Sequence, residues 1–162
     1  MRKIRLYFDT SAIGMIDNDH SPRWQAAAKR MFENINENAD DYELFISKIT
    51  KDEIEQCNPK TRAVIEQLLG AFRFTELPDS AEAAQLAEHY MKGNILSQKH
   101  LADLTHIAYA TVARCDAVIS CNFKHFLNPK IFYRLKRLND ELNLTTPPIW
   151  SPLVFEGKTY NE

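Results

Sequence analysis

Three acidic residues and one asparagine occupy positions at which an α/β chain can place metal-dependent chemistry. Asp9 directly follows a short apolar stretch, Ser120 and Asn122 follow another, and Glu53 and Asp103 lie early in segments with helical spacing. Ligands of open α/β sheets bind beyond the carboxyl ends of the strands, so these side chains can converge on one point. Carboxylates without Cys or His ligands suit Mg²⁺ or Mn²⁺, which are hard cations that prefer oxygen. The pattern therefore predicts a magnesium or manganese site.

Two of the three acidic residues also have a purely structural explanation. Asp9 can act as a turn residue or as the N-cap of a short following helix, and Glu53 ends the capping-box pattern of residues 50–53. Asp103 differs, because Asp is a poor interior helix former and this one lies among Leu, Ala and Ile. His106, one turn further on, either lines the same site or bonds a backbone carbonyl.

Short apolar stretches alternate along the chain with segments of helical spacing. We expect strands at 4–8, 42–46, 72–77, 117–120 and 149–150, and helices at 22–36, from 50, at 58–69, 80–90, 99–114 and 128–142. This alternation predicts a three-layer α/β/α sandwich with a mostly parallel sheet. We expect a single domain over residues 1–156 and a disordered tail at 157–162.

Composition limits the possible classes of protein. The chain has 162 residues, 44% of them hydrophobic, and a formal net charge of −2, which fits one globular domain and excludes a polycation. Its apolar runs are too short for a membrane helix, and the apolar stretch before Asp9 is too short for a secretion signal. Three Cys without Cys-x-x-Cys spacing make a disulfide scaffold a poor explanation. A cytoplasmic location is expected.

Basic residues are concentrated in one part of the chain. Residues 92–137 contain eight Lys and Arg against two acidic residues, whereas the rest of the chain has an excess of acidic residues. Such a segment either favours an anionic partner or forms a solvated helix face.

Four segments around the candidate residues resemble the motif blocks of PIN domains, the small nucleases that include the VapC toxins. The blocks are residues 7–11, 46–54, 101–110 and 118–126, and their order and spacing match over about residues 4–127. The resemblance implies that Asp9, Glu53 and Asp103 are the metal-binding acids. Asn122 falls on the family's fourth polar position, with one negative charge fewer than the fully acidic version of the site.

Together, the residues and the resemblance predict a metal-dependent endoribonuclease that hydrolyses RNA phosphodiester bonds. Asp9 and Asp103 would hold Mg²⁺ or Mn²⁺, Glu53 would bind it through water or position the attacking water, and Asn122 would orient a water ligand or touch the phosphate. The candidate hydrogen-bonding and substrate-binding residues are Thr10, Ser11, Ser120, His106, Lys124 and Lys130. The resemblance also allows the toxin of a toxin–antitoxin pair, with an antitoxin protein as partner, and a homodimer.

Other classes of function fit less well. A phosphatase of the haloacid dehalogenase type needs a second Asp two residues after the first, where this chain has Ser11. A receiver-like signalling domain needs an acidic pair before the site, which is absent here. A catalytically weak or inactive PIN-like module that binds RNA or protein is the main alternative, because composition does not separate it from the enzyme.

Overall fold

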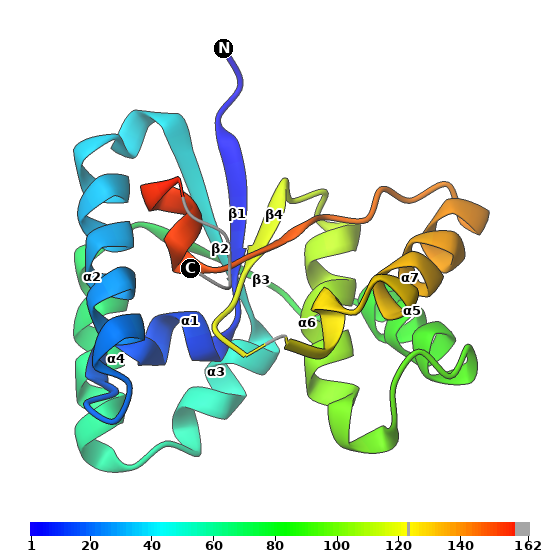
Figure 1. Cartoon of the computed structure of the whole chain (residues 1–162), viewed down its shortest axis with the longest axis horizontal. Coiled ribbons are helices and arrows are strands. Elements are labelled where there is room, and N and C mark those ends of the chain that lie inside the picture. The colour runs from blue at the N-terminus through cyan, green and yellow to red at the C-terminus, as the bar shows by residue number, and fades with distance from the viewer. Residues whose placement is uncertain (123, 158–162) are drawn as a thin grey trace.

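A five-stranded parallel sheet forms the middle layer of the computed structural model, which describes residues 1–122 and 124–157 (Figure 1). The strands are β1 (Ile4–Phe8), β2 (Tyr42–Ser47), β3 (Phe74–Leu77), β4 (Ala117–Ile119) and β5 (Ile149–Trp150). Their order in the sheet is β3-β2-β1-β4-β5, and each neighbouring pair is parallel. The predicted α/β class and parallel sheet are confirmed.

Helices cover both faces of this sheet. The α-helices are α1 (Thr10–Gly14), α2 (Pro22–Glu37), α3 (Lys48–Glu55), α4 (Pro59–Ala71), α5 (Ala81–Lys92), α6 (Leu101–Val112) and α7 (Pro129–Glu141). Short 3₁₀ turns are η1 (Met15–Asp17), η2 (Ala39–Asp41), η3 (Gln98–His100), η4 (Lys124–Leu127) and η5 (Pro152–Glu156). Figure 1 shows α1, α2 and α4 on one side of the sheet and α5, α6 and α7 on the other.

The alternation of side chains along β1 divides the core into two clusters. Leu6 and Phe8 point into the cluster shared with α2 and α4, whereas Tyr7 points into the cluster shared with α5 and α6. All three side chains are fully buried, as expected for the central strand of a parallel sheet with helices on both faces. This burial holds the end of β1, and with it Asp9, in a rigid position.

The start of α3 differs from the prediction. The helix begins at Lys48 with Ser47 as its N-cap, and Oγ1 of Thr50 accepts a hydrogen bond from the Ser47 N–H at 3.3 Å. Thr50 is therefore the third residue of the helix, and the prediction that it opens the helix is wrong. The capping box involves Ser47 and Thr50, which places Glu53 in the second turn, where capping does not account for its carboxylate.

Smaller differences occur at other boundaries. β3 begins at Phe74 rather than at residue 72, and α6 begins at Leu101 because η3 takes up the residues before it. The tail predicted at 157–162 falls, from residue 158 onward, outside the described residues, as does residue 123 of the fourth motif block. Within the described part of the chain, no helix is both long and apolar enough to cross a membrane.

Candidate active site

Asp9 lies at the carboxyl end of β1, and its carboxylate is enclosed by donors. Oδ1 accepts hydrogen bonds from the Ala12 N–H at 2.9 Å and from Oγ of Ser11 at 2.7 Å, and Oδ2 accepts one from Oγ of Ser120 at 2.6 Å. The residue is 3% exposed, and this burial raises the pKa of the Asp9 carboxyl above its ordinary value despite the hydrogen bonds and the charge of His106. Asp9 is thus the N-cap of α1 and also a buried carboxylate at the carboxyl edge of the sheet, where the sequence predicts the site.

Two serines join the turn after β1 to the loop after β4. Ser11 accepts a hydrogen bond from the Cys121 N–H at 2.9 Å, and Ser120 accepts one from the Asn122 N–H at 3.0 Å. Both hydroxyls also bond Asp9, which is one of the two roles predicted for them. Asn122 is exposed and stands next to this network.

Glu53 is held by side chains from two other elements. Its Oε1 accepts a hydrogen bond from Oγ1 of Thr10 at 3.1 Å and also lies against Nε2 of His106. Partial burial alone would raise the pKa of the Glu53 carboxyl, but the hydrogen bond and charge of His106 outweigh burial and lower this pKa. An ionised carboxylate only accepts hydrogen bonds, so Nε2 of His106 carries the shared proton.

The second ring nitrogen of His106 contacts a tyrosine of the core. Its Nδ1 lies 2.7 Å from the Tyr7 hydroxyl, which in turn lies 2.6 Å from Oγ of Ser47. The Tyr7 hydroxyl can donate one hydrogen bond and accept another, so it joins Nδ1 of His106 to Oγ of Ser47. A buried chain of polar groups therefore runs from the N-cap of α3 to the carboxylate of Glu53.

Asp103 lies in the first turn of α6, and its immediate neighbours are two histidines. Its Oδ2 is 3.6 Å from Nδ1 of His100 and 3.5 Å from Nε2 of His125. Partial burial raises the pKa of the Asp103 carboxyl, with a further contribution from the charge of Glu53 and opposing contributions from His100 and His106. Neither histidine was among the residues expected near this carboxylate.

The three predicted acids do not form a compact group of ligand atoms in the described part of the chain. Among the described residues, the one group of at least three His, Cys, Asp or Glu side chains with donor atoms within 4.8 Å of one another is His100, Asp103 and His125. The three acids are nevertheless connected, because Thr10, next to Asp9, and His106, three residues after Asp103, both bond Glu53. Glu53 raises the pKa of Asp103, and a cation between them would relieve this repulsion. The oxygen-rich donor set fits Mg²⁺ or Mn²⁺.

Comparison with solved structures then identifies the architecture. The chain is similar to a chain of the crystal structure of VapBC2 from Rickettsia felis bound to a DNA fragment from their promoter. The two share 14% sequence identity with a TM-score of 0.58, over 91% of this chain and 98% of the other. The fold is PIN-like. No family model and no curated protein matches the sequence.

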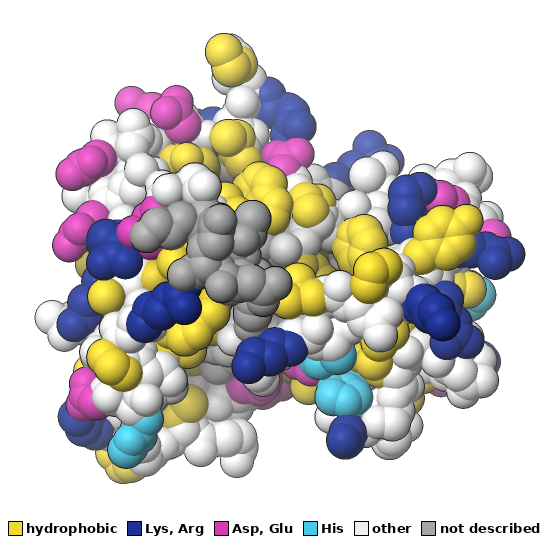
Figure 2. All heavy atoms as spheres, in the orientation of Figure 1, with side chains coloured by type: hydrophobic (Ala, Val, Ile, Leu, Met, Phe, Trp, Pro, Cys, Tyr) yellow, Lys and Arg dark blue, Asp and Glu magenta, His cyan; other side chains and the backbone are white. Residues whose placement is uncertain are grey.

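The residues predicted to contact substrate differ in their exposure to solvent. His106 is only 2% exposed, so the prediction that its ring contacts substrate disagrees with its position between Tyr7 and Glu53. Lys124 and Lys130 are exposed, in η4 and at the start of α7. Figure 2 shows a group of histidine side chains flanked by Lys and Arg side chains on the face that carries η4.

Sequence reasoning missed three residues of the candidate site. Tyr7 begins the first motif block, but nothing local indicates a polar role for it, and its partner His106 lies 99 residues away. His100 stands three residues before Asp103, a spacing that puts both on one helix face and could have been noticed. His125 lies within the fourth motif block, but nothing local links it to Asp103.

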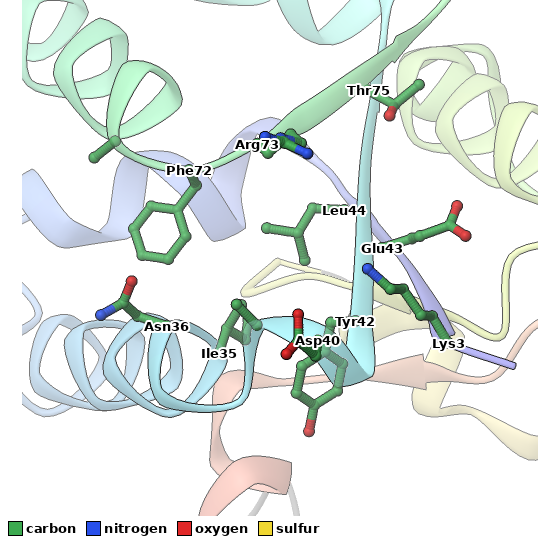
Figure 3. Close-up of a pocket in the computed structure, with 12 residues that line it drawn as sticks. Lys3, Ile35, Asn36, Asp40, Tyr42, Glu43, Leu44, Phe72, Arg73 and Thr75 are labelled. Atoms are coloured by element: carbon green, nitrogen blue, oxygen red, sulfur yellow. The ribbon is translucent and has the colours of Figure 1, made fainter. Parts of the chain in front are cut away.

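A large cavity lies elsewhere in the described part of the molecule. It has a volume of about 580 Å³ and lies at the amino-terminal ends of β2 and β3, next to the end of α2 (Figure 3). Leu44, Ile35 and Phe72 are apolar residues of its lining, and Lys3 and Arg73 are charged ones. Because the carboxyl ends of the strands lie at the opposite edge, this cavity is separate from the candidate active site.

The Tyr7 hydroxyl offers a test of the buried chain. Tyr7→Phe removes the partner of both His106 and Ser47, so we expect the free energy of unfolding to fall by about 1–3 kcal/mol in urea denaturation. Tyr133→Phe is the matched control, because Tyr133 is 61% exposed and should tolerate the change. Equal stabilities of the two variants would show that the chain of hydrogen bonds does not stabilise the fold.

Proposed function

We propose that this chain is a divalent-metal-dependent endoribonuclease that hydrolyses RNA phosphodiester bonds. The observation that carries the proposal is that Thr10, next to Asp9, and His106, three residues after Asp103, both bond Glu53 at the carboxyl edge of a parallel sheet. The motif resemblance to PIN domains and the PIN-like fold support the same activity. The direct test is cleavage of a labelled single-stranded RNA in Mn²⁺ and in EDTA, with Asp9→Asn as the inactive control.

The proposed roles follow from the positions of the side chains. A bound Mg²⁺ or Mn²⁺ would supply a lowered pKa for the attacking water and positive charge beside the phosphate oxygens. Asp9 and Asp103 would hold the cation, and Glu53 would hold it through water or accept a hydrogen bond from the attacking water. Asn122 orients a water ligand or donates its amide N–H to the scissile phosphate.

The neighbours of these residues act as positioning groups. Ser11, Ser120 and the Ala12 N–H fix both oxygens of Asp9, so this carboxylate is held in one orientation. Thr10 and His106 both hydrogen-bond to Oε1 of Glu53, and these two bonds fix the position of that oxygen. A preorganised carboxylate does not have to be reoriented during the reaction, which favours catalysis.

Lys124 and Lys130 are proposed to hold the RNA backbone beside the acids. Asp9→Asn protein should bind single-stranded RNA with an affinity that falls as salt rises, with a log–log slope of about −0.7 per phosphate bound. Replacing both lysines by Ala should make this slope shallower by about 0.7 for each phosphate that the protein no longer neutralises.

Lys29 and Lys60 provide the control for this binding experiment, because they are exposed on α2 and α4. Their double replacement by Ala changes net charge equally and should leave the salt slope close to that of the parent protein. If both pairs reduce the slope equally, Lys124 and Lys130 belong to a solvated surface without a specific role in RNA binding.

A role as the toxin of a toxin–antitoxin pair is the finer form of this proposal. Its support is the resemblance to VapC toxins and the similarity in fold to a chain of VapBC2. The partners would then be an antitoxin that covers the acidic edge and a second copy of this chain, in the cytoplasm. Growth arrest on expression, relieved by co-expression of a small protein from the adjacent reading frame, would support this role.

A catalytically weak or inactive RNA-binding or protein-binding module is the second candidate. Two observations favour it: Asn122 is uncharged, and Asp103 is paired with His100 and His125 rather than with another carboxylate. This candidate predicts RNA binding without cleavage in either Mg²⁺ or Mn²⁺. The cleavage experiment therefore separates the two candidates.

A further inference from the structure

The amino-terminal end of α6 carries a second group of possible metal ligands. His100 immediately precedes α6, Asp103 lies in its first turn, and His125 reaches the same point from η4. One donor atom from each of the three side chains lies within 4.8 Å of the other two. Two elements that are separate in sequence thus bring two imidazoles and one carboxylate to one place.

The spacing of these donor atoms is close to that around a bound cation. The distances from Asp103 Oδ2 to the two ring nitrogens are 3.6 and 3.5 Å. Ligands placed at about 2.0–2.2 Å from a tetrahedral Zn²⁺ are separated from one another by roughly 3.4 Å. Binding would therefore require only small movements of the side chains.

Access and packing are also suited to a cation. The side chains of His100, Asp103 and His125 are 25%, 23% and 21% exposed, so an ion can enter and keep a water ligand. The two histidine rings are 4.4 Å apart between centroids, and the His125 ring also packs against Phe126. These contacts restrict the rings near Asp103.

We propose that His100, Asp103 and His125 form a binding site for a divalent transition-metal cation of the Zn²⁺ class. Imidazole nitrogen favours zinc, nickel or copper over Mg²⁺, which prefers oxygen ligands, and three protein ligands leave a position open. The site goes beyond the proposed ribonuclease activity, because it binds metal whether or not RNA is cleaved. It shares only Asp103 with the set of acids assigned to Mg²⁺ or Mn²⁺.

Metal titration of the whole chain tests this site. After removal of metal with EDTA and dialysis, calorimetric titration with Zn²⁺ should show one tight site, and an excess of Mg²⁺ should not displace it. His100→Gln and His125→Gln should each weaken Zn²⁺ binding by about 10-fold or more, since even loss of a residue that only supports a ligand has effects of this size. His20→Gln, at an exposed histidine outside the group, should bind like the wild type.

Cobalt provides a second readout that does not depend on the folding of a variant. Wild-type protein with one equivalent of Co²⁺ should show visible bands of nitrogen and oxygen ligation without the thiolate charge-transfer band that Cys57 or Cys121 would give. A thiolate band, unchanged Zn²⁺ affinity in both histidine variants, or equal competition by Mg²⁺ would each overturn the proposal. Zn²⁺ binding in a protein that cleaves no RNA would preserve this site and reject the ribonuclease.

Discussion

Asp103→Asn is expected to abolish Mn²⁺-dependent RNA cleavage while the metal-free protein remains at least as stable as the wild type. The substitution preserves the size of the side chain but removes the charge that a hard cation needs. Without the cation, the transition state would lose several kcal/mol of charge stabilisation, which corresponds to a decrease in the cleavage rate of about 100-fold or more. Partial burial and the charge of Glu53 both disfavour the ionised Asp103 carboxyl, so a neutral side chain relieves an unfavourable interaction.

Two measurements on the same variant separate catalysis from a structural role. Cleavage is measured in Mn²⁺, and thermal unfolding is measured in EDTA. A structural role in a buried network would instead lower the metal-free stability by about 1–3 kcal/mol. The contacts with His100 and His125 that the variant lacks are partly exposed, and even charged pairs with such exposure contribute only about 0–1 kcal/mol. Asp52→Asn, at an exposed acid in α3, is the matched control, and full cleavage by Asp103→Asn would contradict the mechanism.

Asp9→Asn is expected to have an equally large effect on cleavage. Asn is a good N-cap, so its oxygen can still accept from the Ala12 N–H, and its amide can donate to the Ser120 hydroxyl. The fold should therefore persist while cleavage falls about 100-fold or more, because Asp9 is a proposed ligand of the cation. Asp9→Ala should also lose stability, by about 0.5–2 kcal/mol for the missing cap. Retained cleavage in the Asn variant would remove Asp9 from the site.

The pH dependence of stability provides an internal check on Asp9. Burial raises the pKa of its carboxyl in the folded protein, so the folded state binds more protons than the unfolded state at intermediate pH. This contribution to stability is present below the unfolded pKa of about 3.9 and is lost as pH rises through the folded value. In EDTA, the stability of Asp9→Asn relative to the wild type should therefore increase with pH across this window. A constant difference would show that burial does not penalise the charge.

The sequence predicted those parts of the site that depend on short-range pattern. Asp9 follows a strand that is apolar and aromatic at its end, and its place after β1 follows directly from that pattern. The alternation of strands and helices predicted the parallel sheet, since parallel strands buried on both faces have continuous apolar sequences. Asp103 could be identified as a candidate site residue because a carboxylate in an apolar helix needs a partner.

The remaining features of the site could not be predicted, because they depend on long-range pairing or on local signals that overlap. Residues 50–53 match a capping box, but Ser47 starts the helix because it directly follows β2 and pairs with Thr50. The partners of Asp103 and His106 depend on how η4 and β1 pack against α6, and no local spacing encodes that packing. Asp103 was therefore identified correctly as unusual, while its histidine neighbours were not expected.

The most direct test of the ribonuclease proposal is the metal dependence of cleavage by the wild-type chain. A 5′-labelled single-stranded RNA is incubated with protein freed of metal, with and without Mn²⁺, and then with EDTA added in excess. We predict defined fragments in Mn²⁺, none in EDTA, and none with Asp9→Asn under either condition. Cleavage that persists in EDTA, that Asp9→Asn performs as well as the wild type, or that is absent with Mn²⁺ would contradict the proposed function.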